Sequence, residues 1–500
     1  MIPRRTFLKT TGALAALGNL GFLSRLPSVT AADAALPPAM VRFDGDIEPL
    51  VRLLEETPRD RVLEEVAARI HRGLSYQQVL AALLLAGVRN IQPRPVGFKF
   101  HAVLVVNSAH LASLASPDSD RWLPIFWAID QFKSSQAADV REGDWTMGPV
   151  DEAAVPPSHR ARKAFTEAMD NWDEPAADVA VVGLLRSAGT DELFEIFCRY
   201  GARDFRDIGH KAIYVANSFR TLEVIGWQHA EPVLRSLAYA LLDRGGAREN
   251  PVQADLPADR PFRENLETIT LLAPEWRDGK VSADGTRELL QTLRTASASE
   301  ASKLTVQLLN RGVAPRSIFD GLFDYAGELL IQTPGIVAVH AMTFTNAIHY
   351  AWHRTQSDET RRLLLLQNAA FLPLYRGNPR AEGQRIDALE PLTPSGKGEE
   401  ALAEVFADIS TDRLVAARKV LGYLRDQGSA RPFADAARRL IFLKGTNSHD
   451  YKFSSAVLED YERVSPVWRE QMLAASVFYL RGSGDRDNAL VQRTRAALDA

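Results

Sequence analysis

Residues 98–113 read FKFHAVLVVNSAHLAS, and residues 337–352 read VAVHAMTFTNAIHYAW. The two stretches lie 239 positions apart, and each carries a histidine at its fourth position within a mostly apolar, helix-like pattern. Both stretches also keep an asparagine and a second histidine at matched places. The matched pairs are His101 and His340, Asn107 and Asn346, and His110 and His349.

A second pair of stretches has the same offset. HKAIYVANSFRTLE begins at His210, and HDYKFSSAVLEDYE begins at His449, again 239 positions later. Shorter identities, such as the Arg-Gly pairs at 72–73 and 311–312, follow the same offset. One constant offset over this length predicts an internal duplication, because an array of short repeats would show a period of about 20–50 residues.

The chain as a whole has the pattern of a helical protein. Apolar residues recur at helical spacing, and the period-two alternation of strands is scarce. We therefore predict an all-α fold in which two tandem related helical halves pack about a pseudo-two-fold axis. Ser75 is the expected N-cap of a helix over Tyr76–Ala86. The predicted divisions are a signal segment over 1–34, a first helical half over 35–244, a linker over 245–284, a second helical half over 285–485 and a C-terminal tail over 486–500.

The N-terminus resembles a twin-arginine export signal. Arg4-Arg5-Thr6-Phe7-Leu8-Lys9 matches the twin-arginine pattern, an apolar run follows over 12–23, and small residues over 29–34 offer a cleavage site. The apolar run is shorter than the ~20 residues of a membrane span. We expect a periplasmic or otherwise exported protein, with the twin-arginine translocase as a partner during export and no stable membrane span. Since this route carries folded proteins, it also favours a bound metal or cofactor.

Composition excludes several classes of protein. The chain has 500 residues, of which 46% are hydrophobic and 24% charged, as in ordinary globular proteins. Its net charge of −4 offers no electrostatic attraction for nucleic acid. The single cysteine, Cys198, excludes internal disulfides, cysteine-rich zinc sites and iron–sulfur clusters held by this chain alone.

Four matched histidines form the candidate site. On a helix that begins at each of them, the residues of the same face are mostly apolar or small, so each imidazole should point towards the core. Neutral imidazole is a common ligand of transition metals, and three or four protein ligands leave a position for substrate or oxygen. Alternatively, these are core histidines that hydrogen-bond to backbone carbonyls. The candidate metal ligands are His101, His210, His340 and His449, and the candidate metals are Fe, Mn, Cu and Zn.

The other histidines are weaker candidates. His110 and His349 lie nine residues after a matched histidine, and on a straight helix they point away from it. His349 and His353 have the i, i+4 spacing of metal ligands, but His353 has no counterpart in the first half. The sequence contains no Glu-x-x-His signature of di-iron bundles and no nucleotide-binding or hydrolase motif. The histidines expected at the surface or in loops are His71, His159 and His229.

Two of the histidine segments resemble motifs of the questin-oxidase-like family. HAMTFTNA at 340–347 resembles the family's His-x-x-Thr-x-x-x-Ala helix, and HDYKFSSA at 449–456 resembles its His-x-x-Lys-x-x-x-Ala helix. The stretch 210–223 is a looser match, with Tyr214 where the family has a second histidine. The resemblance implies an oxidative, Baeyer–Villiger-like opening of a polyketide-derived quinone ring, which requires oxygen and a nicotinamide reductant.

The leading hypothesis is an exported, all-α oxidoreductase, similar to a monooxygenase, that acts on a small organic molecule between the two halves. The four matched histidines are assigned to metal binding or direct catalysis, and Lys452 is a further candidate catalytic residue. The alternatives are a non-catalytic periplasmic scaffold or binding protein with structural histidines, and a metal-dependent hydrolase at the same histidines. The residues expected to support the ligands or to contact substrate are Asn107, Asn217, Asn346, Tyr214 and Lys452.

Overall fold

The computed structural model describes residues 41, 43, 45–376, 384–427 and 429–499. Within these residues the chain forms 23 α-helices and no β-strand, which confirms the predicted all-α class. The predicted signal segment over 1–34 lies outside the described residues. In the described part, no helix combines the length and the apolar character that crossing a membrane requires.

Among the described residues, eleven helices precede residue 245 and twelve follow it. The first group is α2 (Glu48–Glu56), α3 (Val62–His71), α4 (Tyr76–Asn90), α5 (His101–Leu104), α6 (Val106–Leu114), α7 (Leu123–Glu142), α8 (Ser158–Asp170), α9 (Glu174–Leu185), α10 (Thr190–Gly201), α11 (His210–Ile225) and α12 (Ala230–Leu241). The second group is α13 (Arg260–Thr268), α14 (Ala283–Leu293), α15 (Ala298–Asn310), α16 (Pro315–Gln332), α17 (Ile336–Arg354), α18 (Asp358–Phe371), α19 (Glu399–Ile409), α20 (Arg413–Gln427), α21 (Arg431–Lys444), α22 (Ser448–Asp460), α23 (Pro466–Ser476) and α24 (Leu490–Asp499).

Local sequence explains where several helices begin. Ser75 caps α4 as predicted: its hydroxyl accepts a hydrogen bond from the Gln78 backbone N–H, and the Gln78 side chain accepts one from the Ser75 backbone N–H. α15 begins with the same capping box, formed by Ser297 and Glu300. α4 continues to Asn90, beyond its predicted end, because the buried apolar pattern continues.

The helix predicted to begin at His101 is interrupted. α5 ends at Leu104 and α6 begins at Val106. The Leu104 carbonyl accepts a hydrogen bond from the side chain of Asn217 on α11 (2.9 Å). A polar side chain of a neighbouring helix therefore helps to satisfy the backbone where the helix is broken.

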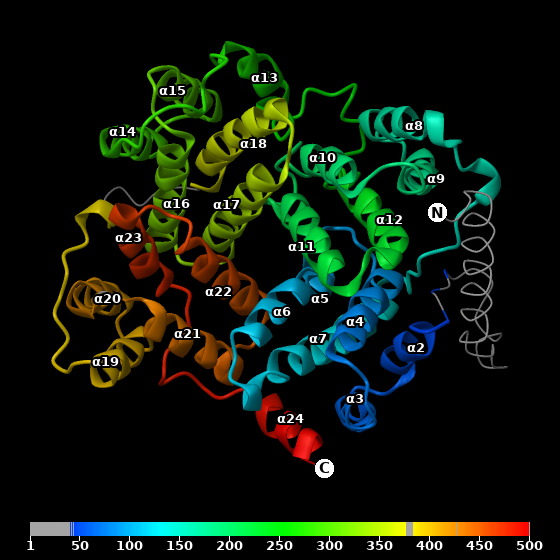
Figure 1. Cartoon of the computed structure of the whole chain (residues 1–500), viewed down its shortest axis with the longest axis horizontal. Coiled ribbons are helices and arrows are strands. Elements are labelled where there is room, and N and C mark those ends of the chain that lie inside the picture. The colour runs from blue at the N-terminus through cyan, green and yellow to red at the C-terminus, as the bar shows by residue number, and fades with distance from the viewer. Residues whose placement is uncertain (1–40, 42, 44, 377–383, 428, 500) are drawn as a thin grey trace, which may run out of the picture.

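The predicted linker and tail both contain helices. α13 lies within 245–284 and packs against α15 and α18. α24 lies within 486–500 and packs against α3 and α7, so the end of the chain returns to its beginning (Figure 1). Sequence patterns miss these helices because each buries only a few side chains, namely Pro261 and Asn265 in α13 and Thr494 and Ala497 in α24.

Four helices form the centre of the molecule (Figure 1). α6, α11, α17 and α22 pack in a closed ring, each against the next, and α5 precedes α6 at one end. The remaining helices surround this central bundle, with those of the first half on one side and those of the second half on the other. The four matched histidines lie on α5, α11, α17 and α22. The bundle therefore brings the candidate ligands into one region.

The order of the helices favours the predicted duplication. Shifted by 239 positions, helices α2–α12 overlap α14–α23 in the same order, with α5 and α6 both falling on α17. Arg220 of α11 forms an ion pair with Glu459 of α22 (3.0 Å), which is its own counterpart at this offset. A residue meets its counterpart in this way when both lie beside a two-fold axis.

A bidentate ion pair recurs at matched positions with its two ends exchanged. In the first half, Arg89 of α4 donates to Glu55 of α2 through Nε and Nη2 (2.8 and 2.7 Å). At the counterpart positions, Arg294 after α14 donates to Glu328 of α16 through the same atoms, also at 2.8 and 2.7 Å. An arginine and a glutamate pair equally well whichever of the two positions each occupies. The equal geometry of the two ion pairs therefore also favours the duplication.

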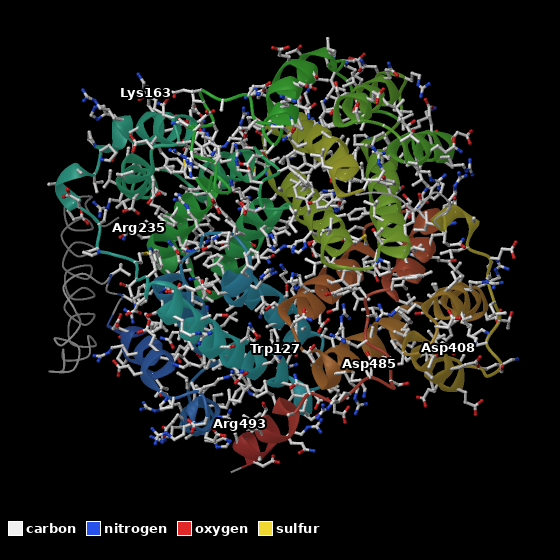
Figure 2. The ribbon with its side chains drawn as sticks, turned by 180° about the vertical axis from the view of Figure 1, so that it is seen from behind. Trp127, Lys163, Arg235, Asp408, Asp485 and Arg493 are labelled. Carbon is white, nitrogen blue, oxygen red and sulfur yellow. The ribbon has the colours of Figure 1, made fainter. Side chains whose placement is uncertain are left out.

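Several contacts join segments that are far apart in the sequence. Trp127 of α7, near the middle of the view in Figure 2, stacks on Tyr451 of α22 with 4.1 Å between ring centroids. Arg493 of α24, at the lower edge of the same view, donates two hydrogen bonds to Glu64 of α3 (2.8 and 2.7 Å). α24 thus holds α3 by an ion pair in addition to apolar packing.

Removing α24 should destabilise the protein. Deletion of residues 490–500 is expected to lower the free energy of unfolding by about 2–4 kcal/mol, because it exposes the surfaces of α3 and α7 that α24 covers. Urea unfolding followed by circular dichroism measures this change. The control Arg493→Gln removes only a half-exposed ion pair and should cost less than about 1 kcal/mol. Equal effects of the two changes would show that α24 adds nothing by packing.

Candidate functional site

Each matched histidine lies near the N-terminal end of its helix. His101 is the first residue of α5, and His210 is the first residue of α11. His449 is the second residue of α22. His340 is the fifth residue of α17, because α17 begins one turn earlier at Ile336. The expectation of a histidine at the helix start therefore holds for His101, His210 and His449. His340 instead lies one turn inside its helix.

Three of the imidazoles are held by the same kind of backbone contact. In each case Nδ1 faces the carbonyl oxygen of a residue three or four positions earlier. Because a carbonyl oxygen can only accept, Nδ1 carries the proton and donates it, and Nε2 is left with a free lone pair. The contacts are His101 Nδ1 to Phe98 O (2.8 Å), His210 Nδ1 to Asp207 O (2.7 Å) and His340 Nδ1 to Ile336 O (2.6 Å).

The Nε2 atoms of these histidines converge. His210 Nε2 lies 2.9 Å from His101 Nε2 and 2.7 Å from His340 Nε2. One nitrogen from each of the four histidines lies within 4.8 Å of the others. His449 completes the group, and its Nε2 has no hydrogen-bond partner among the described residues. Three imidazoles bind backbone carbonyls, as the scaffold interpretation expects, but all four also meet at one place.

The four imidazoles follow one another around a ring. Neighbouring ring centroids are 4.8 Å apart for His101 and His210, 4.1 Å for His210 and His340, 5.2 Å for His340 and His449, and 4.5 Å for His449 and His101. The matched pair His101 and His340 lies across the ring at 6.3 Å. Counterparts that face each other across a shared centre agree with the predicted pseudo-two-fold relation.

The backbone before two of the histidines is unusual. Gly97 (φ +151°) lies against the cluster, and a Cβ at this position would stand 3.4 Å from His210 Cε1 and 3.6 Å from His101 Cε1. Phe98 and Ile208 have φ values of +46° and +44°, which bulky side chains rarely adopt. Angles of this kind cost about 1–3 kcal/mol each and occur often at functional sites.

A cavity of about 450 Å³ adjoins the cluster. Three of the histidines form part of its wall, and the rest of the wall combines apolar side chains with a few polar ones. Phe98 and Ile336 are 79% and 53% exposed, so the apolar wall extends to the protein surface. The wall residues are His101, His210 and His449, the apolar Val96, Phe98, Ile208 and Ile336, and the polar Gln131, Arg206, Asp207, Asn447 and Ser448, with Gly97 between them.

Lys452 lies close to the cluster but outside the cavity wall. It follows His449 by one helical turn on α22 and is 2% exposed. Its Nζ has no hydrogen-bond partner within the described part of the chain. Burial lowers the pKa of Lys452 to about 7. A buried ammonium with three unused donors is a strong anion-binding group for any ligand that reaches it.

The imidazoles are held in their neutral form. Burial lowers the pKa of His101, His210 and His340 well below the usual range, and it lowers the pKa of His449 to about 3. The positive charge of Lys452 lowers all four pKa values further. Neutral imidazole with a free lone pair is the form that binds metal ions.

The asparagines predicted to support the site are used in helix packing. Asn107 donates to Asn217 Oδ1 (3.4 Å), and Asn217 binds the interrupted backbone between α5 and α6. Asn346 donates to Asp460 Oδ1 (2.8 Å) on α22. None of the three lines the cavity, so the prediction of a contact with substrate finds no support for them.

Two further predicted residues have partners elsewhere. The Tyr214 hydroxyl donates to Ser236 Oγ (2.8 Å) and does not reach the cavity wall. His110 Nδ1 lies 3.0 Å from the Tyr76 hydroxyl, so His110 has a structural contact and no place in the cluster, as its position on the helix predicted.

His349 and His353 form a separate pair. Their Nε2 atoms lie 3.1 Å apart, and the ring of His349 packs edge-on against Phe319 and Phe323. Among the described residues, only the central cluster brings three or more metal-ligating side chains together. The surface prediction is right for His71 and His159, which are exposed, and His229 is partly exposed.

Sequence reasoning missed the wall residues that directly precede the histidines. Asp207 and Ser448 each have a buried polar oxygen in or beside the cavity, and Gly97 and Ile208 shape the backbone there. A signal for these segments is present in the sequence: a glycine stands within five residues before each matched histidine. These glycines are Gly97, Gly209, Gly335 and Gly445.

The donor set fits a metal ion. Four buried histidines close together could bind one, with neutral nitrogen donors directed at a common centre. Metal–nitrogen bonds of about 2.0–2.1 Å in a tetrahedral site separate the nitrogens by roughly 3.3 Å. The contacts of 2.7 and 2.9 Å would therefore have to widen by about half an ångström, and the widest separation in the group, up to 4.8 Å, would have to close by about 1.5 Å.

Comparisons with known proteins find no relative. No protein-family model matches the chain, and neither the curated proteins nor the solved structures include a match. The resemblance to the questin-oxidase-like family therefore stays a prediction from short motifs.

His349, a buried histidine outside the cluster, allows a test of how burial changes a histidine pKa. Burial lowers the pKa of His349 to about 3, whereas an unfolded histidine titrates near 6.5. Below pH 6.5 the unfolded chain therefore binds a proton that the folded chain does not, and the folded state loses stability as the pH falls. Between pH 7 and pH 5 this histidine should cost about 2 kcal/mol.

The variant His349→Gln isolates this effect. Its free energy of unfolding should fall by about 2 kcal/mol less than that of the unchanged protein between pH 7 and pH 5. Urea unfolding at both pH values measures the difference. His71→Gln, at an exposed position, is the control and should leave the pH dependence as it is. An identical pH dependence in the His349 variant would contradict a lowered pKa.

Proposed function

We propose that this chain is an exported, helical oxidoreductase that binds a redox-active transition metal between its two halves and oxidises a small organic substrate. The ligands are His101, His210, His340 and His449. The observation that carries the proposal is the convergence of Nε2 atoms whose partner Nδ1 protons are already donated to backbone carbonyls.

Nitrogen atoms that face each other in this way require a cation. The contacts of His210 Nε2 with His101 Nε2 and His340 Nε2 join atoms that both carry lone pairs, so neither contact is a hydrogen bond between neutral rings. A proton or a metal ion between them removes the repulsion. Burial and the charge of Lys452 oppose a proton, because both lower the pKa of the imidazoles. A metal ion, held by up to four donors, fits better.

The donor set narrows the choice of metal. Imidazole suits Fe, Cu and Zn, whereas Mn is more often held by carboxylates. No carboxylate belongs to the cluster as the described residues form it. Fe or Cu would give the site one-electron redox chemistry, whereas Zn would give it hydrolytic chemistry, so the identity of the bound metal decides between the two candidates.

The protein's own residues have distinct roles in this proposal. The histidines would hold and orient the ion, and the metal, when bound, would supply a redox centre. The apolar wall of Val96, Ile208 and Ile336 excludes water and binds the substrate body. Lys452 donates hydrogen bonds to a ligand of the metal, which gives its Nζ the partner that it lacks among the described side chains.

The family resemblance, if it holds, specifies the co-reactants. In a monooxygenase reaction one atom of O₂ enters the substrate and the other leaves as water, and a nicotinamide reductant supplies two electrons and a proton, with a second proton from solvent. The sequence has no nucleotide-binding glycine motif, so in this proposal the reductant reacts as a diffusing second substrate.

Metal-dependent hydrolysis is a second candidate, and one observation favours it. Asp207 lies in the cavity wall, three residues before His210, and its buried Oδ2 has no hydrogen-bond partner in the described chain, although Lys211 Nζ lies 4.0 Å away. Burial raises the pKa of Asp207 to about 7. A carboxyl beside a metal can act as general base for a bound water. Zinc as the native metal would support this candidate.

Metal analysis tests the proposal. Protein purified after export should contain about one Fe or Cu per chain, measured by mass spectrometry of the metals. His210→Ala and His449→Ala should each lower the metal content at least about tenfold, because each removes one of four ligands. His349→Ala is the matched control: it also truncates a buried histidine, but outside the cluster, and should keep the metal.

The outcomes separate the candidates. Less than about one-tenth of a metal ion per chain in correctly folded protein, unchanged by the His210 and His449 variants, would refute the metal site and leave the scaffold interpretation. Zinc without Fe or Cu would refute the oxidoreductase proposal and support metal-dependent hydrolysis. Circular dichroism of every variant confirms that loss of metal is not loss of fold.

Export is tested separately. Arg4→Lys with Arg5→Lys should stop export, because the twin-arginine route recognises the arginine pair. Cell fractionation of a bacterium that has this route measures the protein in the periplasm. The control Lys9→Arg lies beside the pair and keeps the positive charge, so it should be exported. Periplasmic protein from the double variant would refute the proposed export signal.

A further inference from the structure

The cavity lies where the central helices begin. Its wall includes residues at or just before the first turns of α11, α17 and α22. α11 and α17 start after Gly209 and Gly335, and no side chain of the described residues caps either end. Helix N-termini carry unpaired N–H groups and a partial positive charge, both of which attract anions. α22 differs, since the Asn447 side chain already accepts from its backbone.

A second, independent feature of the wall also points to a ligand. Ser448 is 4% exposed and lines the cavity, yet its Oγ has no hydrogen-bond partner among the residues described. Buried hydroxyl groups almost always have a partner, because an unpaired one loses its hydrogen bonds to water without replacement. A ligand oxygen in the cavity would provide the partner.

The charged groups around the cluster differ in how completely they are paired. Arg206 in the wall is neutralised by Asp259, which it binds through two hydrogen bonds of 2.6 Å. Asp207 in the wall lies 4.0 Å from Lys211 Nζ. Lys452 has no such partner in the described structure, and four neutral histidines leave the charge of a bound metal uncompensated. A buried, uncompensated positive charge favours an anionic ligand.

The rest of the wall is apolar. Val96, Phe98, Ile208 and Ile336 contribute hydrocarbon surface, and Phe98 and Ile336 carry it outwards to the solvent. A volume of about 450 Å³ lies within the range of pockets that bind drug-sized organic molecules. The cavity thus has a largely apolar wall and an inner end that attracts anions.

We propose that the cavity binds a small organic carboxylate with an apolar body, its carboxylate facing the histidine cluster, Ser448 and the uncapped start of α11. This inference deepens the proposed function and rests on it where the carboxylate compensates the charge of the metal. The Ser448 hydroxyl donates to one carboxylate oxygen, and the hydrocarbon body lies against Ile208 and Ile336. Phe98, at the outer end, covers the body from solvent.

Two probes of equal shape test the proposal. 2-Naphthoate and 2-naphthamide differ only in the charged head group, and calorimetric titration measures the affinity of each for the full chain. With Zn²⁺ bound at the cluster, naphthoate should bind at least about tenfold more tightly than naphthamide, because its head makes charge-assisted contacts. Ser448→Ala should weaken naphthoate about three- to tenfold and leave naphthamide nearly unchanged.

A control on the same helix makes the result specific. Ser455→Ala also removes a hydroxyl of α22, but this hydroxyl donates to the Ser108 carbonyl and lies outside the cavity, so naphthoate affinity should not change. Equal affinity of naphthoate and naphthamide, or a loss of naphthoate affinity in the Ser455 variant as large as in the Ser448 variant, would overturn the proposal.

Titration of the metal-free chain with Zn²⁺ distinguishes the two proposals. If Zn²⁺ binds and naphthoate is not preferred, the metal site stands and the carboxylate proposal fails. If Zn²⁺ does not bind and naphthoate is still preferred, the metal site fails and the carboxylate is held by Ser448, Lys452 and the helix ends. Preference for naphthoate that increases when Zn²⁺ is added supports both.

Discussion

Three backbone carbonyls decide what the central histidines can do. By accepting the Nδ1 protons of His101, His210 and His340, they turn every Nε2 lone pair towards the same centre. If the protons were on Nε2 instead, the rings could bind one another in a donor–acceptor chain, and the cluster would be an ordinary buried network. The chemistry of the site therefore depends on the loops that present these carbonyls, and this explains why unusual backbone angles occur there.

The central bundle makes this arrangement possible. Each histidine lies near the start of a helix, so the residue three or four positions earlier is outside or at the edge of the helix, with its carbonyl close to the side chain. α6, α11, α17 and α22 pack in a ring and bring four such starts together. α11 and α17 also begin beside the cavity without a side-chain cap. The proposed anion site would therefore depend on the same helix starts that orient the imidazoles.

The sequence predicted the parts of the molecule that depend on pattern. The all-α class follows from apolar spacing, and the choice of His101, His210, His340 and His449 follows from one offset. Other features depend on tertiary contacts and cannot be predicted from a local pattern. They are the break at Val105, the helices α13 and α24, and the roles of Asn107 and Asn346. The wall residues Asp207 and Ser448 depend on backbone conformation before the helices, where only the nearby glycines give a hint.

The exchanged ion pair has a consequence for how a chain with two similar halves folds correctly. If α4 docked by mistake in the place of α16, Arg89 would meet Arg294; if α16 docked against α2, Glu328 would meet Glu55. Both mistakes would bury like charges, at a cost of several kcal/mol, whereas each correct pairing satisfies both groups. The opposite order of Arg and Glu at the matched positions would therefore favour correct pairing of each helix within its own half during folding.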